Sequence, residues 1–189
     1  MSWAHGNGTV SRVGVLDGWQ RCPRCASALT HAAGRVECGA CGFVHWAHSS
    51  PAVSAFAIDA DGRILLGRRA NEPDAGMWDA LGGFLEEGEH PLDALRREVL
   101  EETGLEVVPG AFVGAFVDTY GDEEGAVPVL NLVWEVAVPV GEPQPADDVS
   151  ELHWFERREL PPDGEIAFRW LAPALRQWIT RALRASGSV

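Results

Sequence analysis

Hydrophobic residues recur along most of the chain in patterns that predict strands. Segments rich in β-branched and apolar residues, each bounded by turn residues, are typical of strands in a partly buried sheet. The predicted strands cover 51–58, 63–69, 106–120, 128–138 and 151–155. Asp61-Gly62 lies between the first two and suits a hairpin turn, whereas Pro109 and Gly110 interrupt the third.

Other segments place their apolar residues at helical spacing. The first begins at Pro91, which suits the first turn of a helix, and ends before Gly104, a common C-terminal cap. Its buried stripe is predicted to contain Leu92, Leu95 and Val99. A second helix is expected over 168–183, with Pro173 as an irregularity. Strands and helices in this order predict an α/β or α+β sandwich.

The net charge of the chain limits the classes of binding partner that are compatible with it. The 189 residues carry a net charge of −13. This excess of negative charge disfavours nucleic acid and anionic membranes, which both attract positive proteins. A phosphorylated small molecule remains compatible, provided that a metal ion supplies positive charge locally.

The sequence also predicts the cellular compartment of the protein. No apolar run is long enough for a transmembrane helix, and the first residues lack the apolar core of a signal peptide. We therefore expect a cytoplasmic protein with reduced cysteines.

The composition predicts three segments along the chain. They are a loose tail (1–18), a cysteine-rich segment (19–48) and a main domain (49–189).

All the cysteines lie in the second segment, as two Cys-x2-Cys pairs. The pairs are Cys22 with Cys25 and Cys38 with Cys41. This spacing is typical of a tetrahedral zinc site with four thiolate ligands. Such a closed site leaves no position for a substrate, so its role would be structural. A segment this short buries little apolar surface, and zinc binding would supply its folding free energy.

Other uses of these residues remain open from the sequence. The cysteines could form two disulfides or remain free thiols, although a reducing compartment disfavours disulfides. Histidines in the segment could replace a cysteine as ligand, but we interpret them as surface residues. These histidines are His31, His45 and His48.

The first predicted helix carries an unusual group of carboxylates. Glu98, Glu101 and Glu102 are spaced so that their side chains converge on one face. They repel one another unless a cation lies among them, and their oxygens suit Mg²⁺ or Mn²⁺. The preceding Gly82-Gly83 would let the backbone approach that cation or a phosphate closely. The alternative is a solvated acidic helix face.

The spacing of this region resembles the Nudix box of the Nudix hydrolases. The matching positions are Gly83, Glu89, Arg97, Glu98, Glu101, Glu102 and Gly104. The resemblance implies an α/β/α sandwich with a mixed sheet, preceded here by the small zinc ribbon. It also implies hydrolysis of a nucleoside diphosphate linked to another group, with a small-molecule nucleotide as substrate. A homodimer is a further expectation, since dimers are common in the family.

Residue roles follow from the resemblance. Glu98, Glu101 and Glu102 would hold Mg²⁺ together with the backbone carbonyl of Gly82. The base that accepts a proton from water could be Glu98 or Glu151. Weaker candidates for this base are Asp122, Glu123 and Glu124.

Side chains beyond the box could contact the substrate. Arg68 or Arg69 could grip a phosphate, and the alternative for both is a solvated arginine. Large aromatic residues could stack on a base, although aromatic residues more often pack in a core. The aromatic candidates are Trp46, Trp78, Tyr120 and Trp134.

The cysteine segment suggests a branch of the family. A four-cysteine ribbon before the main domain resembles the NADH pyrophosphatase branch, but 106–125 contains no Ser-Gln-Pro-Trp motif of the kind that this branch uses. ADP-ribose, a nucleotide sugar or a dinucleotide is therefore the leading substrate class. Hydrolysis of NADH or NAD⁺ is the first alternative. A non-catalytic sensor or adaptor is the second, and it conflicts with the presence of every carboxylate of the box.

Overall fold

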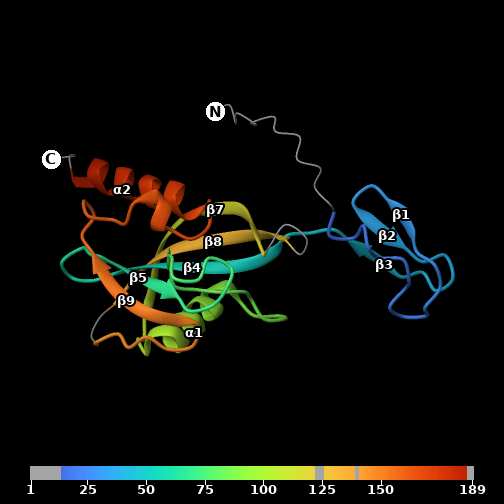
Figure 1. Cartoon of the computed structure of the whole chain (residues 1–189), viewed down its shortest axis with the longest axis horizontal. Helices are drawn as coiled ribbons and strands as arrows, with labels where there is room; N and C mark the ends of the chain where they lie inside the picture. The colour runs from blue at the N-terminus through green and yellow to red at the C-terminus, as the bar shows by residue number, and fades with distance from the viewer. Residues whose placement is uncertain (1–13, 122–125, 139–140, 187–189) are drawn as a thin grey trace. The chain divides into compact units, whose positions relative to one another are not determined.

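The computed structural model describes residues 14–121, 126–138 and 141–186. The chain divides into two compact units, one ending at His48 and the next beginning at Ser49 (Figure 1). Within the described residues, no helix has both the length and the apolar character needed to cross a bilayer.

The first unit is a small antiparallel sheet with cysteine turns. Its strands are β1 (Thr30–Ala32), β2 (Arg35–Glu37) and β3 (Val44–Trp46), in the order β1-β2-β3. Val36 is fully buried in this sheet, and Leu16, in the turn that precedes it, is also buried. The unit therefore has a very small apolar core, which agrees with the prediction that a metal supplies part of its folding free energy.

A mixed sheet forms the centre of the second unit. Its strands are β4 (Ser50–Ile58), β5 (Ile64–Arg69), β6 (Trp78–Asp79), β7 (Val108–Tyr120), β8 (Val127–Ala137) and β9 (Val149–Phe155). The order is β6-β5-β4-β8-β7, and β9 also pairs with β5. β4 and β8 run parallel, whereas the other pairs are antiparallel. The predicted mixed sheet is confirmed.

The helices of this unit cover opposite faces of the sheet (Figure 1). Helix α1 (Pro91–Thr103) packs on the face that carries Val53, and helix α2 (Leu171–Ser186) packs on the face that carries Phe56. A 3-10 turn, η1 (Asp163–Glu165), precedes α2. Because side chains alternate along a strand, β4 supplies both cores. The expected α/β/α sandwich is confirmed.

Helix α1 begins and ends where the sequence predicts. The His90 side chain caps its start by accepting a hydrogen bond from the Leu92 N–H at 3.2 Å. Gly104 adopts φ 70° at the other end, and its N–H donates to the Leu100 carbonyl at 2.8 Å. The left-handed φ explains why glycine is suited to this position.

Helix α2 begins later than the sequence pattern predicts. Phe168 adopts φ 56°, so the backbone there cannot belong to a right-handed helix. The helix starts at Leu171, which puts Pro173 in its first turn rather than in its interior. A proline there costs no helical hydrogen bond, so the expected irregularity is absent.

The segment after β6 supplies the link between the sheet and α1. Leu81 and Gly83 accept backbone hydrogen bonds from Ala55 and Val53 of β4, at 2.7 and 2.9 Å. Gly82, between them, adopts φ 141°, and a Cβ atom there would lie 2.2 Å from the Val53 carbonyl oxygen. Only glycine allows this close approach of two backbones.

Substitution of Gly82 tests this constraint. Gly82→Ala should lower the free energy of unfolding by about 3 kcal/mol, because the methyl group collides with backbone in a conformation that alanine rarely adopts. Gly164→Ala is the matched control, since an added Cβ there meets nothing within 4 Å. Chemical denaturation measures both variants. Equal stability of the two variants would contradict the close approach of the loop and β4.

Candidate functional site

The glutamates of α1 lie against the double glycine. The Gly82 N–H donates a hydrogen bond to Oε2 of Glu102 at 2.9 Å. Glu98 lies so close to Gly83 that an added Cβ would be 2.6 Å from its Oε2. The missing side chain of Gly83 therefore makes room for the Glu98 carboxylate, whereas that of Gly82 makes room for the backbone of β4.

Glu102 is a buried carboxylate with little positive charge around it. Only 4% of its surface is exposed. Burial raises the pKa of Glu102 well above its usual value, and the negative charges of Asp148, Asp79 and Glu98 raise it further. The Gly82 N–H opposes this shift. A buried carboxylate in this position gains from a nearby cation.

Glu98 is half-buried and shares the same environment. Burial raises the pKa of Glu98, and the negative charges of Glu101 and Asp148 act in the same direction. Arg97 opposes the shift with a hydrogen bond from Nη1 to Glu98 Oε1 at 2.8 Å. A raised pKa suits a carboxylate that has to accept a proton near neutral pH.

Arg97 connects the outer carboxylates. It contacts Glu89 at 2.9 Å, Glu98 at 2.8 Å and Glu101 at 3.1 Å. The hydrogen bonds with Glu89, followed by those with the other two glutamates, raise the pKa of Arg97. In return, Arg97 lowers the pKa of Glu89 to about 2. The predicted pairing of Arg97 with Glu101 is present.

The carboxylates differ in how tightly they are gathered. Within the part of the chain that the structure describes, only the cysteines place three or more ligand atoms within 4.8 Å of one another. Glu101 is about half exposed and contacts Arg97. The donor set of Glu98, Glu101 and Glu102 nevertheless fits a hard divalent cation, because it offers oxygen atoms and excess negative charge.

Asp148 joins this site from a distant part of the chain, and the sequence analysis did not identify it. Its charge raises the pKa of Glu98, Glu102 and Asp79. Asp147, just before it, adopts φ 53° in the turn that leads into β9. The only signal in the sequence was the Asp147-Asp148 pair before a predicted strand.

Arg69 is held in place by neighbours on both sides. Its Nε donates to the Pro73 carbonyl at 2.7 Å and its Nη1 donates to Asp79 at 3.1 Å. Burial raises the pKa of Asp79 to about 6, although Arg69 opposes this shift. Arg69 lines a pocket beside Gly82 and Gly83, where it could contact a ligand.

Arg68 and Glu151 form a cross-strand pair between β5 and β9. Arg68 Nε lies 3.3 Å from Glu151 Oε2, but the atoms are poorly aligned, and Nε has no hydrogen-bond partner among the residues that the structure describes. The guanidinium lies over the ring of Trp78 at 4.6 Å. The structure thus brings these two predicted residues to each other. The weaker base candidates Asp122, Glu123 and Glu124 lie outside the described residues.

The predicted aromatic residues occupy different environments. Tyr120 lines the pocket beside the double glycine. Trp78 is buried in the core under α2, Trp134 packs against Phe112 at 5.0 Å, and Trp46 lies under Arg35 in the first unit. Of these four, only Tyr120 contributes to the pocket.

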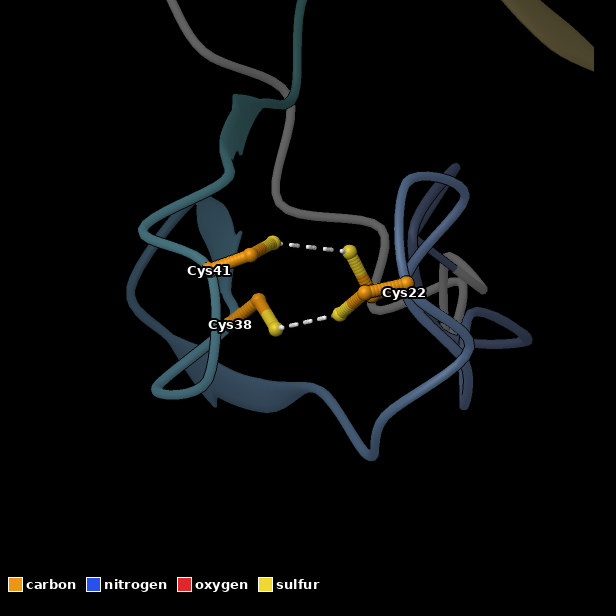
Figure 2. Close-up of side chains that lie close together, drawn as sticks. Cys22, Cys38 and Cys41 are labelled. Atoms are coloured by element: carbon orange, nitrogen blue, oxygen red, sulfur yellow. Dashed lines mark hydrogen bonds between the residues drawn. The ribbon is translucent and has the colours of Figure 1, made fainter.

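The cysteines of the first unit converge on one point. Figure 2 shows Cys22, Cys38 and Cys41 directed toward a common centre. The sulfur atoms of Cys22 and Cys41 are 3.6 Å apart, and those of Cys25 and Cys38 are 3.5 Å apart. A zinc–thiolate tetrahedron has edges of about 3.8 Å. The four sulfur atoms therefore fit tetrahedral coordination of zinc.

Comparison with known proteins places the second unit in a family. The family model described as NUDIX domain matches residues 48–177. The chain is 36% identical over 104 residues to an ADP-ribose pyrophosphatase of Methanocaldococcus jannaschii, covering 55% of this chain and 60% of that protein. It is 30% identical over 153 residues to the NAD-capped RNA hydrolase NudC of Vibrio atlanticus, covering 77% of this chain and 54% of that protein.

Solved structures agree on the fold. A crystal structure of a NUDIX hydrolase from Nitrosomonas europaea matches with a TM-score of 0.70 and 22% identity, covering 89% of this chain and 93% of that chain. At this identity the match supports the fold alone. The chain spans little more than half the length of the two relatives above, 60% and 54%.

Replacement of Glu89 tests the role of Arg97. Because the pKa of Glu89 is lowered to about 2, its pairing with Arg97 stabilises the fold above the usual glutamate pKa. This stabilisation is lost as pH falls from about 4.5 toward 2. Glu89→Gln should therefore be less stable than the parent protein at pH 7, with the difference shrinking at low pH.

Denaturant unfolding at several pH values measures this difference. Glu87→Gln is the control, since Glu87 is exposed and lies in the same loop. A difference between the parent protein and Glu89→Gln that stays constant from pH 7 to pH 2.5 would contradict the pairing.

Proposed function

The chain belongs to the Nudix family, and on this basis we propose that it hydrolyses the diphosphate linkage of a nucleoside diphosphate derivative such as ADP-ribose. The observation that carries the proposal is the buried Glu102, which lies among other carboxylates and directly beside a pocket at Gly82. An anionic cluster next to a pocket suits a reaction on a phosphate that arrives together with a cation.

The proposed cation is Mg²⁺ or Mn²⁺, held by Glu98, Glu101 and Glu102, with the backbone carbonyl of Gly82 as a further ligand. We add Asp148 to this set, since its charge acts on both Glu98 and Glu102. When bound there, such a cation would neutralise the diphosphate, activate water and stabilise the leaving group.

The side chains of this site then have distinct tasks. Glu98 is the favoured base: it would take a proton from water as the water oxygen bonds to phosphorus. The bond from phosphorus to the bridging oxygen would break, and its electron pair would leave with the departing phosphate. Arg97 orients Glu98 through their hydrogen bond. Arg69 is proposed to bind a phosphate of the substrate, because Pro73 and Asp79 fix its guanidinium at the pocket.

Glu151 and Arg68 are proposed as secondary participants. They form a partly exposed ion pair across β5 and β9, without a well-aligned hydrogen bond, and neither residue contacts the glutamates of α1 in a printed ion pair. A mutation of Glu151 should therefore affect turnover less than a mutation of Glu98.

Hydrolysis of NADH, NAD⁺ or an NAD-capped RNA is the second candidate. The match over 77% of the chain to a NudC protein favours it. The missing Ser-Gln-Pro-Trp motif and the net charge of −13 favour a small substrate without a long nucleic acid.

The structural zinc of the first unit is proposed on the geometry of the cysteines. Four convergent thiolates leave no open position, so the metal would stabilise the unit without taking part in hydrolysis. We also propose that the protein acts in the cytoplasm, where this site stays reduced, and that it forms a homodimer.

Replacement of Glu102 tests the proposed hydrolysis. Incubation with ADP-ribose, NADH and nucleotide sugars plus Mg²⁺ should release nucleoside monophosphate. Glu102→Gln should lower kcat by roughly two to three orders of magnitude, the loss typical of removing one preorganised electrostatic group. Product analysis by chromatography measures the rates.

Glu106→Gln is the control, because Glu106 is exposed just after the helix. Release of no product from any substrate would overturn the proposal. If Glu102→Gln and the parent protein bound nucleotide equally and neither turned it over, a sensor or adaptor would be the better description.

Zinc content tests the first unit separately. The purified protein should contain one zinc per chain by elemental analysis, and Cys38→Ser should lose it. Because zinc supplies much of the folding free energy of such a site, trypsin should then cleave rapidly at Arg35. Thr30→Ser, an exposed position in β1, should behave like the parent protein. Full resistance to trypsin in Cys38→Ser would contradict a structural metal.

A further inference from the structure

Two residues with unusual backbone conformations contact each other beside Arg69. Asp74 adopts φ 61° and Phe168 adopts φ 56°, and among the described residues other than glycine only Ala26 and Asp147 also have a positive φ. The Phe168 N–H donates a hydrogen bond to Oδ2 of Asp74 at 3.2 Å. The two residues lie 94 positions apart in the chain, so the tertiary structure joins two conformations that each oppose the preference of the residue.

The conformation of Phe168 also opposes its local sequence. The apolar pattern over 168–183 favours a helix that begins at Phe168, but α2 begins at Leu171. Backbone conformations of this kind persist only where surrounding contacts hold them. The hydrogen bond to Asp74 is such a contact, and it keeps Phe168 out of the helix.

The turn that carries Asp74 is fixed to the end of β5 by backbone hydrogen bonds. The Arg69 N–H donates to the Met77 carbonyl at 3.0 Å, and the Gly76 N–H donates to the Arg69 carbonyl at 2.9 Å. Within the turn, the Met77 N–H donates to the Asp74 carbonyl at 3.1 Å. The Asp74 carboxylate is therefore an acceptor in a defined position.

The same turn and Phe168 both support the Arg69 side chain. The Pro73 carbonyl accepts a hydrogen bond from Arg69 Nε at 2.7 Å. The Arg69 guanidinium lies 4.9 Å from the centre of the Phe168 ring, which is a cation–π contact. Only 11% of the Arg69 side chain is exposed. Because the ring and the carbonyl restrict the guanidinium, its remaining donors have a defined direction.

We propose that Asp74 is a positioning residue for the proposed hydrolysis. Its carboxylate fixes Phe168, and the Phe168 ring holds the Arg69 guanidinium in the orientation that binds a phosphate. Asp74 does not line the pocket that contains Arg69 and Phe168, so it acts through these neighbours. The inference rests on the proposed function, since it concerns the residue that would bind the phosphate.

Binding of an analogue that resists hydrolysis tests this role. In the analogue of ADP-ribose, a methylene group replaces the bridging oxygen, and calorimetry measures its binding to the full-length protein with Mg²⁺. Asp74→Gly removes the carboxylate, and glycine adopts the left-handed conformation without strain. This variant should bind the analogue about fivefold more weakly, the effect of one lost cation–π contact. Asp74→Asn should bind like the parent protein, because its carboxamide oxygen accepts the same N–H and asparagine tolerates the same conformation.

Asp59→Gly is the matched control for a purely structural loss. Asp59 also fixes a turn, since its carboxylate accepts the N–H groups of Asp61 and Arg63 at 3.0 and 2.8 Å, and it does not line the pocket. This variant should bind the analogue like the parent protein, even where it melts at a lower temperature. Thermal unfolding shows which variants are folded at the temperature of the titration.

A double-mutant cycle tests whether Asp74 acts through Phe168. Phe168→Ala should weaken binding by itself, and adding Asp74→Gly to it should cause no further loss. In the hydrolysis of ADP-ribose, Asp74→Gly should raise KM about fivefold and leave kcat within about twofold, because the removed contact orients the phosphate-binding group.

The outcomes separate this inference from the proposed function. Unchanged binding in Asp74→Gly, an equal loss in Asp74→Asn or Asp59→Gly, or a further loss in the double variant overturns the inference even if ADP-ribose is hydrolysed. The predicted pattern of binding supports it even if no substrate is turned over, in which case only the proposed hydrolysis fails. A parent protein that binds no analogue overturns the inference together with the proposed substrate.

Discussion

The close approach of one backbone segment to a strand and a helix is the constraint on which the rest of the second unit depends. Gly82 has no room for a side chain beside Val53, and its N–H donates to Glu102 of α1. Through this contact the sheet, the loop and the helix are fixed relative to one another. A bulkier residue would move the carboxylates away from the pocket that Gly82 also lines.

The carboxylates fall into two groups, according to whether a positive charge compensates them. Arg97 balances Glu89 and Glu101 at the outer end of the cluster, where the ion pairs are partly exposed. Glu102 receives only a backbone N–H and is surrounded by further negative charge. The outer group therefore stabilises the fold, whereas the inner carboxylate is in an environment that a bound cation would relieve.

Side chains along β4 alternate between the two faces of the sheet, and the two faces support different parts of the site. Val53 and Ala55 pack in the core under α1, whereas Phe56 packs in the core under α2 and Ser54 lines the pocket beside the double glycine. One strand thus supports the helix of the acidic cluster on one face and contributes to the pocket with its other residues. The double glycine, at the edge of β4, is where these two regions meet.

The sequence alone determined the features that depend on local spacing. Helix α1 with its Gly104 cap, the gathering of glutamates on one of its faces and the two cysteine turns follow from neighbouring residues. The mixed sheet followed from the family resemblance. Tertiary structure decided the contribution of Asp148, because it reaches the site through the pairing of the distant strands β5 and β9. It also fixed the late start of α2, where contact with Asp74 holds Phe168 out of the helix that its local pattern favours.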